Sequence, residues 1–151
     1  MHLSGPDDYI NASHVRVQVG KTTLDYIACQ GPLPNTTGDI WRMVWEQKAE
    51  VIAMVTQDME GGKVKCHRYW PDSVATPFTI NNQYEISLSQ VQTLAHFDVH
   101  HIKMEDLETG RVHRVTHLNF TAWPDQGSPE SGIPLLQVNP SFISVRNFDW
   151  Q

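Results

Sequence analysis

A short unbroken apolar run, Val51 to Val55, most constrains the fold of this chain. A run without polar alternation is typical of a strand that is covered on both faces in the middle of a sheet. Around it, alternating apolar and polar residues predict further strands. These strands cover Asp8 to Val19, Leu24 to Cys29, Phe78 to Leu88, Val91 to Met104 and Val112 to Phe120, with breaks at Asn81-Asn82 and Thr109-Gly110.

One helix is predicted between the second strand and the apolar run. Asn35, Thr36 and Thr37 offer helix caps, and the helix should end near Lys48. Its apolar residues fall on one face: Ile40, Trp41, Val44 and Trp45. A short second helix is predicted near Phe142. One clear helix among many strands predicts an α/β fold with a mixed, strongly twisted sheet, which further helices should flank.

Composition limits the class of protein. The 151 residues are 40% hydrophobic, which suits one globular domain. The formal net charge is −6 without a dense Lys/Arg cluster, so nucleic acid is not an expected partner. No apolar window is long enough to cross a bilayer, and the start lacks a signal-peptide pattern. With only two cysteines, the chain is expected in the cytoplasm without membrane insertion.

Eight histidines raise the question of a metal site. Five of them are crowded into one stretch: His96, His100, His101, His113 and His117. However, none of the Cys-x-x-Cys or His-Glu-x-x-His spacings of metal sites is present. We therefore expect solvent-facing histidines on strands, and neither a metal nor a cofactor.

A candidate general acid follows the last predicted strand. Asp125 lies in the segment Leu118 to Pro129, between Trp123-Pro124 and Gly127. Proline fixes φ on one side of the carboxylate and glycine permits a sharp bend on the other. Such a segment can swing between two rigid supports, as mobile catalytic loops do.

Four motifs in order resemble the catalytic domain of protein tyrosine phosphatases. They are Asp8-Tyr9-Ile10-Asn11-Ala12-Ser13, Tyr26 to Thr36, Lys65-Cys66-His67-Arg68-Tyr69-Trp70-Pro71 and Trp123-Pro124-Asp125. The similarity runs from about Asp8 to Gly127. Three shorter stretches are most similar to the large non-receptor phosphatases that carry FERM and PDZ modules: Gly20-Lys21, Ala28-Cys29-Gln30 and Trp45 to Lys48.

The resemblance implies hydrolysis of phosphotyrosine proteins through a cysteinyl-phosphate. Asp125 then corresponds to the general acid that protonates the departing phenolate, whose free pKa is about 10. Trp123 and Pro124 correspond to the hinge and packing anchor of the acid loop, and Gln126 stands where the family usually has histidine.

A charged hairpin beside the active site is also implied. Paired glycines predict a hairpin tip over Glu60 to Lys63. In the family, the matching glutamate holds the phosphate-binding arginine and the lysine contacts the acid loop. Glu60 and Lys65 match these residues, and solvated hairpin charges are the alternative.

The nucleophile of the family is missing from this sequence. The family pattern is His-Cys, five residues, then Arg, downstream of the acid loop. Six positions after Cys29 stands Asn35, six after Cys66 stands Asp72, and no cysteine follows Cys66. We therefore assign residues 1–137 to a partial phosphatase domain, severed before the cysteine loop, and residues 138–151 to a divergent tail. The chain alone is predicted to be inactive.

Other residues of the motifs receive structural roles. The second Trp-Pro-Asp copy places Asp72 in a surface turn, and Cys66 should be a buried small hydrophobic residue. Asn11 and Gln30 should hydrogen-bond backbone groups to hold neighbouring loops. The phosphotyrosine-stacking tyrosine of the family precedes the first motif, so Tyr9 and Tyr26 do not inherit that role.

Three hypotheses stay open at this point. The first is a phosphatase with Asp125 as acid, and the second is a non-catalytic binding or dominant-negative isoform. The third is an incomplete gene model of a longer phosphatase, whose missing elements would leave sheet surface exposed.

Overall fold

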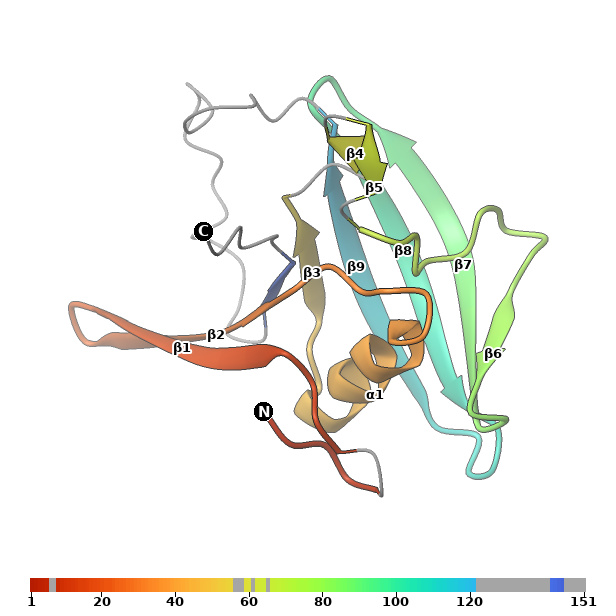
Figure 1. Ribbon diagram of the computed structural model, residues 1–151, viewed down its shortest axis with the longest axis horizontal. Helices are drawn as coiled ribbons and strands as arrows, with labels where there is room; N and C mark the ends of the chain where they lie inside the picture. Colours follow the sequence, from red (N-terminus) through yellow and green to blue (C-terminus); the bar gives the residue numbers. More distant parts are fainter. Residues whose placement is uncertain (6–7, 56–58, 61, 65, 122–141, 146–151) are drawn as a thin grey trace.

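The computed structural model describes residues 1–5, 8–55, 59–60, 62–64, 66–121 and 142–145. These residues form an eight-stranded sheet, a two-stranded ribbon and the helix α1, Thr37–Gln47 (Figure 1). The sheet strands are β1 (Ala12–Val19), β2 (Thr22–Cys29), β3 (Val51–Met54), β6 (Phe78–Ile80), β7 (Tyr84–Thr93), β8 (Phe97–Asp106), β9 (Val112–Phe120) and β10 (Phe142–Val145). The ribbon pairs β4 (Met59–Glu60) with β5 (Lys63–Val64).

The sheet is mixed, as predicted. Its order is β1-β2-β10-β3-β9-β8-β7-β6. The four middle strands, from β2 to β9, run parallel to one another, and antiparallel strands continue the sheet on both sides. All four residues of β3 are buried between two neighbouring strands, which confirms the interpretation of the apolar run.

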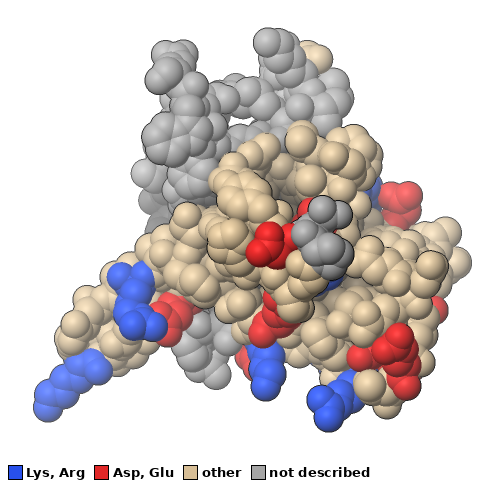
Figure 2. Space-filling view, turned by 60° about the horizontal axis from the view of Figure 1, so that its bottom comes forward, with Lys and Arg blue, Asp and Glu red and all other residues tan. Residues whose placement is uncertain are grey.

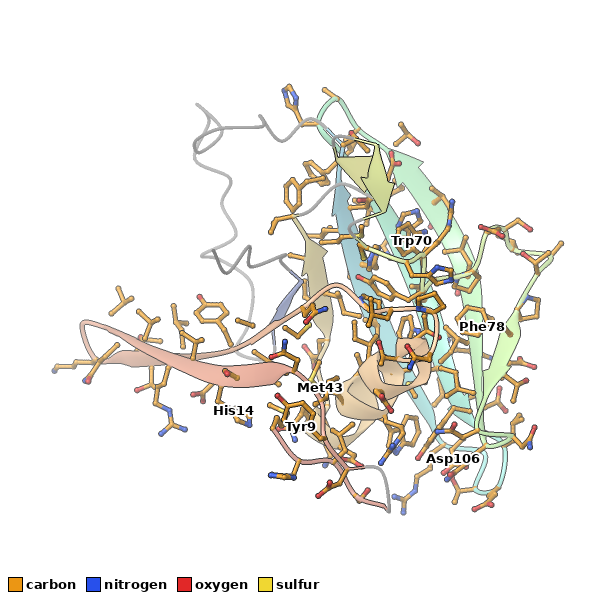
Figure 3. The ribbon with its side chains drawn as sticks, viewed as in Figure 1. Tyr9, His14, Met43, Trp70, Phe78 and Asp106 are labelled. Atoms are coloured by element: carbon orange, nitrogen blue, oxygen red, sulfur yellow. The ribbon has the colours of Figure 1, made fainter. Side chains whose placement is uncertain are left out.

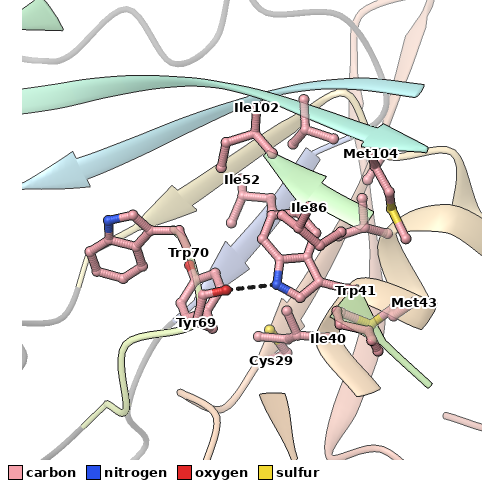
Figure 4. Close-up of a cluster of buried hydrophobic side chains, with 14 of the residues drawn as sticks. Cys29, Ile40, Trp41, Met43, Ile52, Tyr69, Trp70, Ile86, Ile102 and Met104 are labelled. Carbon is pink, nitrogen blue, oxygen red and sulfur yellow. Dashed lines mark hydrogen bonds between the residues drawn. The ribbon is translucent and has the colours of Figure 1, made fainter. Parts of the chain in front are cut away.

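Helix α1 packs on one face of the sheet. Ile40, Trp41 and Val44 are buried, as predicted, and Trp45 is half-buried. Together with buried residues of the strands they form the main core, which Figure 4 shows in part. The helix ends at Lys48, which adopts a left-handed conformation with φ of 53°. Thr36 is the N-cap residue, but its hydroxyl bonds to the backbone of Leu33 instead of capping the helix.

One predicted strand is two strands. The interval Val91 to Met104 contains a chain reversal, because β7 ends at Thr93 and β8 begins at Phe97. A hydrogen bond of 3.0 Å from Leu94 N–H to Phe97 C=O closes this turn. The turn holds neither glycine nor proline, so the usual sequence signals of a reversal are missing. The break at Asn81-Asn82 is confirmed, since both residues have positive φ between β6 and β7.

The helix predicted near Phe142 is wrong. Residues 142–145 form β10, which pairs in parallel with β2 on one side and β3 on the other. Each of its residues is thereby matched to two strands. Ladders on both sides outweigh the weak local preference of a four-residue segment.

The first strand is shorter than expected. It begins at Ala12 instead of Asp8, and Tyr9 forms an isolated bridge with His2. The second strand begins earlier than expected, at Thr22. Gly20, with φ of 61°, turns the chain between them, which makes β1 and β2 a hairpin with a two-residue loop.

Charged side chains are dispersed over the face shown in Figure 2, where described Lys and Arg residues lie among Asp and Glu. Within the described part of the chain, no helix is long and apolar enough to span a membrane.

Candidate active site

The carboxyl ends of the four parallel strands lie together along one border of the sheet, its carboxyl-terminal edge. β2 ends there at Cys29, β3 at Met54 and β9 at Phe120. In open α/β sheets, ligands bind beyond the carboxyl ends of the strands, where the connecting loops gather. This edge is therefore the candidate site.

The predicted acid loop follows β9 at this edge. Thr121 is the last described residue before it, and its N–H bonds to the carbonyl of His96 at 3.0 Å. The acid-loop residues themselves lie outside the described residues: Trp123, Pro124, Asp125 and Gln126. Their roles stay predictions.

The charged hairpin follows β3 at the same edge. Its reversal is confirmed, because Glu60 pairs with Lys63 and Gly62 has φ of 78°. Glu60 thus lies at the end of β4, whereas Lys65 lies outside the described residues.

The segment Cys66 to Pro71 is fixed against this edge by backbone contacts. The N–H of His67 donates to the carbonyl of Pro32 at 2.9 Å. The indole Nε1 of Trp41 donates to the carbonyl of Tyr69 at 2.7 Å (Figure 4). Tyr69, Trp70 and Pro71 are buried. Helix α1, through Trp41, and the loop before it, through Pro32, therefore hold this segment in place.

Two histidines and a tyrosine form a buried hydrogen-bonded chain. The Tyr69 hydroxyl lies 2.8 Å from Nε2 of His117, and Nδ1 of His117 lies 3.0 Å from Nδ1 of His100. His117 is 0% exposed and His100 is 5% exposed. The expectation of solvent-facing histidines is wrong for these two residues.

Strand alternation could have located both buried histidines. His117 follows buried Val115 by two positions on β9, and His100 precedes buried Ile102 by two positions on β8. Residues two apart share a face, so both imidazoles belong to the core face. His101 and His113 are half-buried, and His96 is exposed.

Burial favours the neutral form of both imidazoles. Burial lowers the pKa of His117 well below its usual value, and His100 and Arg68 lower it further. Burial also lowers the pKa of His100; Arg68 acts in the same direction and the Asp98 carboxylate opposes it. In a neutral pair, one Nδ1 donates its proton and the other accepts it. The contact therefore allows two tautomeric arrangements of the neutral pair and excludes protonation of both imidazoles, while burial disfavours protonation of either one.

Trp70 covers this pair. Its ring centroid lies 4.7 Å from that of His117 and 5.6 Å from that of His100. The guanidinium of Arg68 lies 4.8 Å from the same indole centroid and pairs with Asp72 at 3.0 Å. The Asp72 side chain is 78% exposed, which confirms its place in a surface turn. In the view of Figure 3, Trp70 lies below the β4–β5 ribbon, where it overlaps the sheet.

Both thiols are buried. Cys66 is 2% exposed, which confirms its prediction, and its thiol contacts the carbonyl of His67 at 3.5 Å. Burial, with a smaller effect from nearby Cys66, raises the pKa of Cys29 to about 12. A thiol with this pKa is almost entirely protonated at neutral pH, and the thiolate is the nucleophilic form.

Asn11 and Gln30 differ from their prediction. Their side chains bond to each other, Nδ2 of Asn11 to Oε1 of Gln30 at 2.7 Å, instead of to backbone groups. The backbone contact between them runs from Gln30 N–H to Asn11 C=O at 3.2 Å. Both residues flank the paired ends of β1 and β2, so the amides lie side by side. Among the described residues, no cluster of three or more His, Cys, Asp or Glu could hold a metal ion.

Comparison with known proteins agrees with this arrangement. The family model described as protein-tyrosine phosphatase matches residues 1–146. The chain is 51% identical over 142 residues to mouse tyrosine-protein phosphatase non-receptor type 13. This alignment covers 94% of this chain and 6% of that protein. It is 42% identical over 129 residues to human non-receptor type 20, covering 85% of this chain and 30% of that protein.

A third relative extends this pattern. Human tyrosine-protein phosphatase non-receptor type 14 is 43% identical over 145 residues, covering 91% of this chain and 12% of that protein. The chain thus spans less than a third of the length of these relatives. The match over nearly all of its residues shows that the chain belongs to the protein-tyrosine phosphatase family.

Proposed function

We propose that this chain supplies the acid-loop half of a phosphotyrosine-protein phosphatase, with Asp125 as the general acid. The observation that carries the proposal is the convergence of β9, the segment Cys66 to Pro71 and the β4–β5 ribbon at one edge of the sheet. β9 delivers Thr121 to that edge, four positions before Asp125. A carboxylic acid on such a loop suits protonation of a leaving phenolate.

The proposal includes the supporting roles that the family resemblance implies. Trp123 and Pro124 serve as hinge and packing anchor of the acid loop, Gln126 follows the acid in sequence, and Lys65 and Glu60 act as the charged pair beside the active site. We infer that further helices flank the sheet. The tail 138–151 is proposed to diverge only towards its end, because the family model extends to residue 146 and residues 142–145 pair within the sheet. The names of the relatives favour a cytoplasmic location and phosphotyrosine proteins as substrates.

Covalent catalysis needs a nucleophile that these 151 residues do not supply. No cysteine follows Cys66 in the sequence, and Cys29 is a buried, protonated thiol. The chain by itself is therefore expected to hydrolyse no phosphotyrosine peptide. Hydrolysis by the purified chain that disappears in Asp125→Asn would contradict this expectation.

The role of Asp125 is testable in a chimera. The remainder of the phosphatase domain is taken from mouse non-receptor type 13 and joined to this chain. Asp125→Asn should lower kcat by about 10²–10⁴-fold, the usual contribution of a general acid. The matched control is Asp72→Asn, in the second Trp-Pro-Asp copy, which should leave kcat unchanged. Equal effects of both substitutions would exclude the assignment of Asp125.

A further inference from the structure

We propose that the free edge of β1 pairs with β1 of a second copy of this chain, in antiparallel register about a two-fold axis through Val17. The β1–β2 hairpin extends away from α1 and the rest of the sheet (Figure 1). β1 lies at one end of the sheet order, and no described strand pairs with its outer edge.

Among the described residues, this edge has few of the features by which proteins protect sheet edges. Such features are short strands, prolines, bulges, charged side chains and covering segments; here the Met1 amino group contacts the edge at Ala12, and Arg16 is the one cation of the strand. The opposite edge has two of them, because β6 has three residues after Pro77 and β7 has a bulge between Leu88 and Gln90. β1, in contrast, pairs with β2 over eight residues without interruption and contains no proline.

The single Lys or Arg side chain of β1 is paired with a carboxylate. Arg16 lies directly opposite Asp25 on β2, and its Nε is 2.7 Å from a carboxylate oxygen. Its charge therefore repels an approaching strand less than a free guanidinium would. Figure 2 shows the hairpin projecting with Lys and Arg side chains along it and an acidic side chain near its base.

The backbone groups that face outward can be assigned. The carbonyl of Asn11 accepts from Gln30, toward β2, whereas the carbonyl of Ala12 accepts from the amino group of Met1, away from β2. Because successive residues alternate in direction along a strand, even-numbered residues of β1 point outward. The groups available to a further strand are therefore those of His14, Arg16 and Gln18.

The side chains impose a pattern on the partner. Val15, Val17 and Val19 share one face and are 40%, 41% and 56% exposed. His14, Arg16 and Gln18 stand on the other face, and side chains project from both faces of the hairpin in Figure 3. A partner strand must offer alternating apolar residues on the valine face and no cation opposite Arg16.

A second copy of β1 satisfies both conditions. With Val17 on the axis, Val15 faces Val19 of the other copy, and Arg16 faces Gln18 of the other copy. Arg16 and Gln18 then exchange backbone hydrogen bonds, and the two Val17 side chains form a closely spaced non-hydrogen-bonded pair. A register centred on Arg16 would place two guanidinium groups opposite each other, which is unfavourable.

The oligomeric state tests this proposal. Sedimentation equilibrium of the purified chain, over a roughly hundredfold range of concentration, should show a monomer–dimer equilibrium. Val17→Lys places like charges opposite each other and should weaken the dimer by roughly tenfold or more. Val74→Lys changes a valine that is 60% exposed outside the hairpin and should have no effect. Circular dichroism verifies that both variants fold.

Cysteine cross-linking tests the register. Val17→Cys should form a disulfide-linked dimer under mild oxidation, whereas Val15→Cys and Val19→Cys should cross-link efficiently only when mixed. The native Cys29 and Cys66 are buried and serve as the internal control. A monomer at all concentrations, a dimer that Val17→Lys leaves intact, open-ended aggregation or a different cross-linking pattern would each overturn the proposal.

Discussion

The Nδ1 atoms of His100 and His117 lie 3.0 Å apart between β8 and β9, with both imidazoles buried. The contact joins adjacent strands on the face that α1 covers. Through Tyr69 it also links β9, the strand that leads to Asp125, to the segment that follows Lys65. One of the family's motifs, through its residue Tyr69, is therefore joined to β9 by hydrogen bonds between uncharged groups instead of an ion pair.

Stability is expected to fall on acidification because of this pair. The pKa of His117 is lowered by burial in the folded chain, while the unfolded chain keeps about 6.5, so the unfolded state binds more protons below that pH. The contribution of His117 to the free energy of unfolding is fully present above pH 6.5, and it is lost as the pH falls from there through the folded pKa. Between about pH 7.5 and about pH 5.5, His117 should cost about 1 kcal/mol of unfolding free energy.

Urea unfolding at the two pH values measures this effect. His117→Gln removes this titrating group and should reduce the pH dependence, the remaining part of which comes from His100. Constant stability over this range in the unmodified chain would contradict the prediction.

Tyr69→Phe is expected to destabilise the chain. The substitution removes the hydroxyl from buried Nε2 of His117, 2.8 Å away, and leaves that nitrogen unpaired. The cost should be about 1–3 kcal/mol, measured by chemical denaturation. Tyr9→Phe is the control, since Tyr9 is 66% exposed and its loss should cost less than about 0.5 kcal/mol. Similar costs for the two variants would show that the Tyr69 bond contributes nothing.

The two cysteines should resist thiol reagents in the folded state. Both side chains are buried, and the pKa of Cys29 is raised to about 12, so little thiolate is present at pH 8. Labelling with a disulfide reagent should be slow in buffer and fast for both thiols in concentrated guanidinium. Rapid labelling of either thiol in buffer, with circular dichroism unchanged, would contradict the burial described above.

Lys48→Gly should stabilise the chain. Lys48 ends α1 with φ of 53°, a conformation that glycine adopts without steric cost. The gain should be roughly 0.5–1 kcal/mol in thermal or chemical unfolding. Gln47→Gly, one position earlier and inside the helix, should instead cost about 1 kcal/mol. A loss of stability with Lys48→Gly would show that a lysine side-chain contact outweighs the backbone strain.

Much of the secondary structure could be predicted from the sequence because it depends on local periodicity. The apolar run of β3, the apolar face of α1 and the reversal at Asn81-Asn82 each depend on neighbouring residues alone. The same holds for the family, whose motifs are contiguous. The turn at residues 94–96 escaped prediction because contacts between β7 and β8, and not turn residues, define it.

By itself, then, the sequence determined the family, the buried centre of the sheet and the identity of the candidate acid. The tertiary structure alone decided three matters: β10 is a strand because two parallel neighbours pair with it, Tyr69 meets His117 across 48 positions, and Asn11 meets Gln30. Each depends on residues that are distant along the chain. Local propensity is worth fractions of a kcal/mol per residue, so long-range pairing and burial override it.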